Sequence, residues 1–274
     1  MGEVLANLKH PVVAAVRRSL GQLGGEAPTA FVIEGASRIG QAVSAGAPVE
    51  TVLFLDPVST PEDRALRESL PGVTIAAHLV ARGVFFRLLD LGYETATRVF
   101  ATVRAEPLPA ERLGELADPQ ACFLVGERIQ DPRNVGVLIR TAEALGVRAA
   151  IFGLGSADPY SRAAVRSTTG SILRVPLVRA EGLPAVLRDL RTRGVRLIGS
   201  SAHASTPVWE ADLAPPCAVV LGNETAGLSA ELQDLCDVRV AIPMRGEASS
   251  LNVTVAAGVL LYEVVRGATA TTGG

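Results

Sequence analysis

The stretch IPMRGEASSLNVTVAAGVLLYEVVR, from Ile242 to Arg266, opens as the end of a strand, passes through a short polar loop and continues as a long apolar segment. The apolar part, residues 251–265, predicts a final helix that is buried on nearly every side, because a helix that is apolar all round must be covered all round. Ser249, Ser250 and Asn252 stand at its start, where side-chain oxygens cap free backbone N–H groups. One cap needs one such residue and here there are three, so either the helix is capped in the ordinary way or a ligand binds at its end.

Upstream of this stretch, apolar strands alternate with helical patterns through the second half of the chain. The expected strands are 121–127, 149–154, 195–200, 218–222 and 238–243, and the expected helices are 134–145, 161–167, 183–193 and 229–235. Such alternation predicts a parallel sheet that is covered by helices on both faces. The fold class is therefore α/β.

The first half of the chain has the same character on a smaller scale. Residues 31–57, FVIEGASRIGQAVSAGAPVETVLFLDP, predict a strand, a helix and a second strand, and 73–105 predict two more strands around one helix. The segment EPLPAERLGELADPQ, 106–120, has three prolines and several charges, as is typical of a domain boundary. We therefore expect a small α/β N-terminal domain over 1–106, a linker over 107–119, a larger domain over 120–266 and a disordered tail over 267–274.

Composition limits the class of protein. The 274 residues are 48% hydrophobic and 20% charged, which suits a soluble globular protein. No apolar run approaches the ~18 residues of a membrane helix, and the N-terminus lacks the hydrophobic core of a signal peptide. Three cysteines without a CxxC pair and three scattered histidines show no zinc spacing. We expect a cytoplasmic protein with buried thiols, no membrane contact and no metal.

The net charge of −2 does not favour nucleic-acid binding, but the distribution of arginine does. All basic residues except Lys9 are arginine, which a GC-rich genome explains for the chain as a whole. Between Asp131 and Arg179, however, seven arginines face only three acidic residues. Arginine makes two-pronged contacts with phosphate, so this cluster indicates a surface for RNA or another phosphate-bearing partner.

Three unusual segments follow strands, where open parallel sheets bind their ligands. ERIQDPRNVGVLIRTAEALGV, 127–147, offers Asn134 as an N-cap, with Arg140 one turn beyond Gly136 on the same helix face. VVLGNETAGLS, 219–229, ends a strand in Gly222 and Glu224, and lacks the glycine patterns of dinucleotide and phosphate loops. The third segment is the opening stretch. Each alone is compatible with ordinary turns, caps and surface arginine.

Taken together and in this order, NVGVLIRTAEALG, LGNETAGLS and IPMRGEASSLNVTVAAGVLLYE resemble the three signature motifs of the SpoU (TrmH) family of RNA ribose methyltransferases. DPYSRAAVRSTTGSILRVPLV, 158–178, is similar to the middle region of that family. The resemblance is close from Cys122 to Arg266. It is looser over 31–46, which looks like the small RNA-binding domain, similar to a ribosomal-protein fold, that many members carry. It implies a SPOUT domain with a deep trefoil knot that forms the pocket for S-adenosylmethionine.

The resemblance also implies the site residues. Cofactor contacts are expected at Gly199, Ser200, Gly222, Ile242, Met244 and Leu251, and catalytic or positioning roles at Asn134, Arg140, Glu224, Ser250 and Asn252. Contacts with RNA phosphates are expected from Arg133, Arg162, Arg166 and Arg174. Because a guanidinium stays protonated, Arg140 is better suited to hold a phosphate and stabilise developing negative charge than to act as a base.

The resulting hypothesis is an S-adenosylmethionine-dependent RNA 2′-O-methyltransferase whose substrate is ribosomal RNA rather than tRNA. A tRNA methyltransferase and a non-catalytic RNA-binding relative remain alternatives, and the missing glycine fingerprint disfavours a nucleotide-dependent oxidoreductase. We also expect a homodimer. One sheet covers only one side of the all-apolar helix 251–265, so a second subunit, with its helix 135–145, would cover the other.

Overall fold

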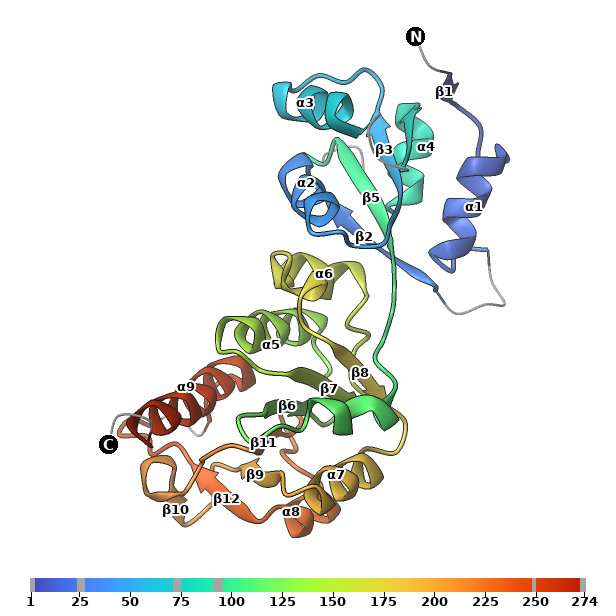
Figure 1. Cartoon of the computed structure of the whole chain (residues 1–274). Helices are drawn as coiled ribbons and strands as arrows, with labels where there is room; N and C mark the ends of the chain where they lie inside the picture. The colour runs from blue at the N-terminus through green and yellow to red at the C-terminus, as the bar shows by residue number, and fades with distance from the viewer. Residues whose placement is uncertain (1–2, 24–27, 71–74, 91–95, 248–249, 272–274) are drawn as a thin grey trace. The chain divides into compact units, whose positions relative to one another are not determined.

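The computed structural model describes residues 3–23, 28–70, 75–90, 96–247 and 250–271. The chain forms two compact units, of which the first is Met1–Glu106 with Tyr160–Arg166 and the second is Pro107–Pro159 with Ser167–Gly274 (Figure 1). The segment 160–166, expected in the larger domain, belongs to the first unit. The ring of Tyr160 lies 5.3 Å from the ring of Phe31, and Arg162 forms an ion pair with Glu34.

The second unit is built on a seven-stranded parallel sheet. Its strands are β6 (Cys122–Gly126), β7 (Ala149–Gly153), β8 (Leu177–Ala180), β9 (Arg196–Ser200), β10 (Thr206–Pro207), β11 (Cys217–Leu221) and β12 (Val238–Ala241). The strand order is β10-β12-β9-β11-β6-β7-β8, and all neighbours are parallel. The predicted α/β class with a parallel sheet is confirmed.

Helices cover this sheet on both faces (Figure 1). They are α5 (Pro132–Ala144), α7 (Leu183–Thr192), α8 (Ala230–Leu235) and α9 (Val253–Thr271), with short 3-10 turns η3 (Ser171–Leu173) and η4 (Val208–Glu210). The helix α6 (Arg162–Thr168) is not one of them, because most of it belongs to the first unit. Alternate side chains of β6, such as Phe123 and Val125, join one core with Leu187 of α7 and Leu232 of α8. The other face packs against α5 and α9, which also contact each other.

The first unit contains a mixed five-stranded sheet in the order β1-β4-β3-β5-β2. Its elements are β1 (Val4–Leu5), α1 (Pro11–Ser19), β2 (Ala30–Glu34), α2 (Ala36–Ser44), β3 (Val49–Leu55), α3 (Pro61–Ser69), β4 (Ala76–Val80), α4 (Arg82–Leu88) and β5 (Val99–Arg104). Strand β5 runs antiparallel to β3 and β2, whereas β1, β4 and β3 are parallel. Phe85, Phe86 and Phe100 fill the core with edge-on ring contacts.

Three boundaries differ from expectation. Helix α5 begins at Pro132, and its N-cap is Asp131, whose Oδ1 accepts the backbone N–H of Arg133, so Asn134 is not the cap. The expected linker, 107–119, contains the 3-10 helix η2 (Ala110–Leu116), and Leu113 is fully buried in the core beside α7, because its apolar side chains complete that face. The tail that was expected to be disordered, 267–274, is helical at its start: α9 begins at Val253 and continues to Thr271. Residues 272–274 of that tail lie outside the described residues.

In the part of the chain that the structure describes, no helix combines the length and apolarity required to cross a bilayer. Nor do three or more His, Cys, Asp or Glu side chains gather there in a way that could hold a metal ion.

Candidate functional site

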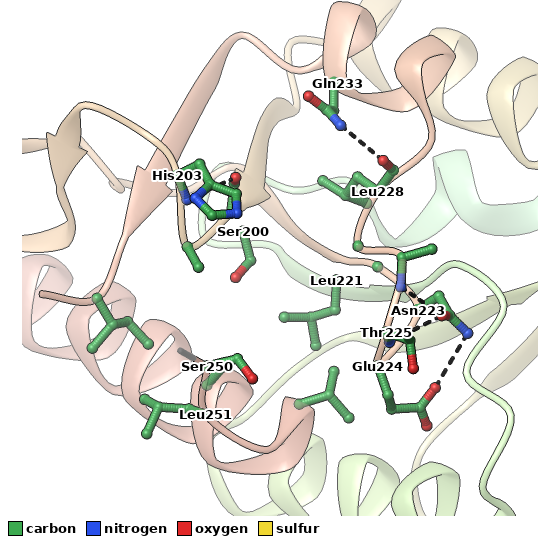
Figure 2. A pocket seen from close by; sticks show the side chains of 18 of the residues that line it. Ser200, His203, Leu221, Asn223, Glu224, Thr225, Leu228, Gln233, Ser250 and Leu251 are labelled. Atoms are coloured by element: carbon green, nitrogen blue, oxygen red, sulfur yellow. Dashed lines mark hydrogen bonds between the residues drawn. The ribbon is translucent and has the colours of Figure 1, made fainter. Parts of the chain in front are cut away.

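A pocket of about 390 Å³ opens at the carboxyl ends of β9, β11 and β12 and beside the start of α9 (Figure 2). Its described lining consists of Ser200–His203, Leu221–Leu228, Gln233, Ile242, Met244, Ser250, Leu251, Val253 and Ala256. The strand ends supply the floor, because parallel strands leave their carboxyl ends at one edge of the sheet. Apolar side chains and loop backbone thus surround a cavity of ligand size.

The loop after β11 folds back on itself in a tight turn. Asn223 and Gly227 exchange backbone hydrogen bonds of 3.1 and 2.9 Å, and Asn223 Oδ1 accepts the backbone N–H groups of Thr225 and Ala226. A side chain at Gly222 would overlap the backbone of Gly227 and Leu228, so only glycine fits there. The turn directs Glu224 away from the sheet, toward the start of α5.

Glu224 connects two of the motif segments. Its carboxylate accepts hydrogen bonds from the backbone N–H groups of Gln130 and Asp131 at 3.2 and 3.3 Å, and from Asn134 Nδ2 at 3.0 Å. Burial acts to raise the pKa of Glu224, but the hydrogen bonds, first that of Asn134 and then those of the backbone, outweigh it and lower the pKa. The Glu224 carboxylate therefore connects the start of α5 to the loop after β11 through its hydrogen bonds.

Asn134 and Asn252 extend this network to the third motif. Because Asn134 donates its Nδ2 to Glu224, its Oδ1 faces the Nδ2 of Asn252, at 3.5 Å. Asn252 Oδ1 in turn accepts the backbone N–H of Thr254 at 2.8 Å and caps α9. Ser250 lines the pocket instead, and Ser249 lies outside the described residues. The start of α9 is thus capped by one of the three polar residues and offers another to the pocket.

Five of the six predicted cofactor residues line the pocket: Ser200, Gly222, Ile242, Met244 and Leu251. Gly199 does not line it. A side chain at Gly199 would come within 2.9 Å of Cys236 Sγ and 3.2 Å of Leu228, so glycine at this position allows β9 to pack against the segment around α8.

Arg140 lies apart from the other predicted catalytic residues. It is exposed on α5, does not line the pocket, and forms no ion pair with any residue that the structure describes. It lies six positions after Asn134, and six positions turn a helix by about 240°, which places the two side chains on different faces. Asn134, Glu224, Asn252 and Ser250 are brought together, whereas Arg140 is not.

Most of the predicted RNA-contacting arginines are paired within the chain. Arg133 bonds Asp131 at 2.8 Å, Arg162 bonds Glu34 at 2.6 Å and Arg174 bonds Glu143 at 2.8 Å. Only Arg166 of the four is exposed without an ion pair to the described residues. The arginine cluster of the sequence is therefore largely neutralised by carboxylates, several of them distant along the chain.

The sequence interpretation missed five polar residues of the pocket. Ser201 and His203 follow β9, Asn223 and Thr225 belong to the loop after β11, and Gln233 comes from α8. A signal was available for the first two, because they directly follow Ser200 at the end of a predicted strand. Gln233 carries no such signal, since its helix reaches the pocket only through tertiary packing.

Comparison with known proteins adds three findings. The model of the SpoU rRNA Methylase family matches residues 121–262. The chain is 31% identical to the Bacillus subtilis 23S rRNA (guanosine(2553)-2′-O)-methyltransferase RlmP, over 85% of this chain and 88% of that protein. It is 35% identical to the 23S rRNA (uridine(2479)-2′-O)-methyltransferase of Streptomyces viridochromogenes, over 88% of this chain and 86% of that protein.

A solved structure resembles the whole chain as well. The SpoU methyltransferase AviRb from Streptomyces viridochromogenes, in complex with the cofactor AdoMet, aligns with a TM-score of 0.78 at 30% identity. The alignment covers 95% of this chain and all of that one. The similarity therefore includes both units of the chain.

Proposed function

The chain belongs to the SpoU rRNA Methylase family, and from that membership we propose that it transfers a methyl group from S-adenosylmethionine to a ribose 2′-hydroxyl of ribosomal RNA. The ribosomal substrate is supported by the names of its relatives, of which RlmP and the Streptomyces uridine methyltransferase act on 23S rRNA. A ribosomal RNA substrate would place the enzyme in the cytoplasm.

One observation in the structure carries the proposal: the pocket and the hydrogen-bonded motif network share residues. Glu224 lines the pocket and also bonds Asn134, and Ser250 lies two residues from Asn252. The volume of about 390 Å³ falls in the range of small-molecule sites. Leu221, Ile242 and Leu251 suit the apolar faces of an adenosyl group, and the loop backbone offers polar contacts, so the residues fit S-adenosylmethionine.

Bound S-adenosylmethionine supplies an electrophilic methyl group. The residues of this chain must align the acceptor oxygen with it, and alignment alone can supply several kcal/mol of the barrier. Asn134 and Asn252 have amide groups whose directions are fixed by Glu224 and by the α9 cap, so we assign them to positioning the ribose. Ser250 would add a hydroxyl on the pocket side.

Arg140 is assigned to the substrate side. Since it does not line the pocket, it would hold the phosphate next to the acceptor ribose and stabilise negative charge as it develops there. Glu224 is not assigned as the base, because its oxygens already accept hydrogen bonds that hold the loop. The hydroxyl proton would leave through a phosphate oxygen or water.

Two properties of the second unit belong to the same proposal. We propose that the segment 242–266 threads an earlier loop and forms a deep trefoil knot around the pocket. We also propose a homodimer, supported by α9, where Val255, Tyr262 and Val265 are 50%, 57% and 37% exposed. These positions recur at helical spacing, so they form one apolar stripe that a second subunit would cover.

The first unit would contact the RNA. Its support is the resemblance of 31–46 to an RNA-binding domain and the exposed charge of Arg166, which forms no ion pair within 4 Å with the described residues. Arg133, Arg162 and Arg174 would reach phosphates only by exchanging their present carboxylate partners, so we rank them below Arg166.

The proposal is tested by methyl transfer to RNA. Ribosomal RNA from cells that lack this gene should accept radiolabelled methyl groups from the purified protein, and RNA from cells that carry it should not. An RNA fragment with one 2′-deoxy substitution at the mapped nucleotide should accept none. Continued methylation of that fragment would show that the acceptor is a base, and transfer to tRNA alone would move the substrate to the alternative class.

A further inference from the structure

The pocket contains few side chains that can carry charge. Among its described lining residues, His203 and Glu224 are the only ionisable ones, and no lysine or arginine lines it. Figure 2 shows the two well apart, with Leu221 drawn between them. The pocket therefore has an acidic end, next to the Asn134–Asn252 network, and an imidazole end.

Two other polar side chains of the lining already form hydrogen bonds within the chain. Gln233 donates its Nε2 to the Leu228 carbonyl at 2.8 Å and accepts from Arg239 at 2.9 Å, and Ser201 Oγ accepts the backbone N–H of His203. The ring nitrogens of His203, in contrast, form no hydrogen bond or ion pair with any residue that the structure describes. Among the described lining side chains His203 is the one imidazole, and its ring offers an N–H donor that no described residue uses.

We propose that His203 binds the carboxylate of the amino-acid part of S-adenosylmethionine, and thereby fixes the direction in which the cofactor enters the pocket. The inference rests on the proposed function. The methyl group must lie near Asn134 and Asn252, and there the carboxylate of Glu224 favours the positive sulfonium. The only anionic group of the cofactor is its own carboxylate, which Glu224 repels, whereas the unused imidazole N–H of His203 can donate a hydrogen bond to it.

The experiment compares two ligands that differ in the amino-acid part. Calorimetry on the full chain would measure S-adenosylhomocysteine, which has the carboxylate, and 5′-methylthioadenosine, which lacks the whole amino-acid group. His203→Ala should weaken S-adenosylhomocysteine binding about tenfold, the loss expected for one charge-assisted hydrogen bond. Binding of 5′-methylthioadenosine should be unchanged, and His203→Lys should recover most of the loss. In the methyl-transfer assay, His203→Ala should raise KM for the cofactor and leave kcat near wild type.

The matched control is His78→Ala, which removes a histidine of the first unit that does not line this pocket. It should bind both ligands as wild type does. An equal loss of both ligands in His203→Ala would place His203 on the adenosine and overturn the inference, as would no loss of either. If wild type binds neither ligand, the proposed function fails as well, whereas failure of the variant effects alone leaves that function standing.

Discussion

At the scale of single residues, the site depends on shape as much as on reactive groups. Glu224 has the charge of a catalytic acid or base, yet its hydrogen bonds to Gln130, Asp131 and Asn134 make it a bracket between two motif segments. Gly222 has no functional group, yet it decides whether the loop that contains Glu224 can close. Arg140 is the one cationic side chain among the predicted catalytic residues, and it forms no ion pair with the described part of the chain.

Replacing Arg140 with Ala should abolish methyl transfer and leave cofactor affinity nearly unchanged, because Arg140 is exposed on α5 and does not line the pocket. Losing a positioned charge at a reacting centre costs about 10²-fold or more in rate. Arg140→Lys should recover little, since an ammonium cannot make the planar two-pronged phosphate contact. Calorimetry with S-adenosylmethionine and a radiolabelled transfer assay on the same variant would decide. Near-normal transfer would remove Arg140 from the mechanism, and loss of cofactor binding would give it a structural role.

Gly222→Ala should abolish cofactor binding, because the added methyl group would overlap the backbone of Gly227 and Leu228 and force the loop open. The fold should survive, since the displaced segment is a loop that follows the carboxyl end of β11 and is not part of the sheet. Gly246→Ala is the control, because a methyl group there meets nothing within 4 Å. Isothermal titration with S-adenosylhomocysteine would compare the two variants. Equal affinity in both would mean that the loop is not part of the cofactor site.

At the scale of elements, one ion pair ties α6 to β2 in the first unit. Glu34 is 8% exposed and bonds Arg162 at 2.6 Å and Thr97 at 2.6 Å. Burial acts to raise the pKa of Glu34, but the hydrogen bonds from Arg162 and Thr97 and the charge of Arg162 outweigh it and lower the pKa. Arg162, which the sequence analysis assigned to RNA phosphates, thereby anchors the segment 160–166 to β2.

Glu34→Gln should lower the free energy of unfolding by on the order of 2 kcal/mol at neutral pH, because it leaves Arg162 without its charged partner. Since the folded pKa of Glu34 is lowered, its stabilising effect is complete above the unfolded value of about 4.3 and disappears as pH falls through the folded value. The difference between variant and wild type should therefore shrink below about pH 4.3. Urea unfolding followed by circular dichroism across pH 3–7 would measure it.

Glu50→Gln is the matched control for this measurement. It removes a carboxylate of the same unit that bonds Arg104, but at the surface, where the two side chains are 33% and 58% exposed. Such pairs contribute about 1 kcal/mol or less, so this variant should unfold almost like wild type. Equal destabilisation by both substitutions would argue against a special role for the Glu34–Arg162 pair.

At the scale of the whole molecule, the apolar stripe on α9 predicts self-association. The wild-type protein should sediment at twice the mass of one chain at micromolar concentration. Val255→Asp with Tyr262→Asp should yield a monomer, because two charges would be buried in the proposed interface. Leu154→Asp is the control, since Leu154 is 77% exposed in the loop after β7 and is not part of the α9 stripe, so its replacement should leave the dimer intact. A monomeric wild type would exclude the dimer.

RNA affinity is also a property of the whole molecule, because every arginine that binds a phosphate releases counterions and adds to the salt dependence of the binding constant. Arg166→Ala should weaken RNA binding across sequences and reduce the salt dependence of the binding constant by about one ion. Arg112→Ala should change neither, since Arg112 is already bonded to Glu115. Filter-binding titrations between low and physiological salt would compare the slopes. An unchanged slope for Arg166→Ala would exclude Arg166 from the RNA surface.

The sequence by itself determined the α/β class, the positions of five of the seven strands and of the main helices in the second half, and the family, but not β8 or β10. It could do so because period, glycine turns and N-cap residues are local properties, and because the three motif segments contain their own polar residues. The domain boundaries were predicted less well. Whether residues 107–119 pack or remain exposed depends on a core whose other residues come from elsewhere in the chain.

Only the tertiary structure decided which side chains work together. Asn252 meets Asn134 across 118 residues and Arg162 meets Glu34 across 128, and no local pattern encodes either partner. The same is true of Gly199, which packs beside Cys236, and of His203, which faces the pocket. The type of a residue indicates which chemistry it can perform. Its burial, hydrogen-bond partners and neighbouring charges depend on segments that only folding brings into contact, and these contacts determine its role.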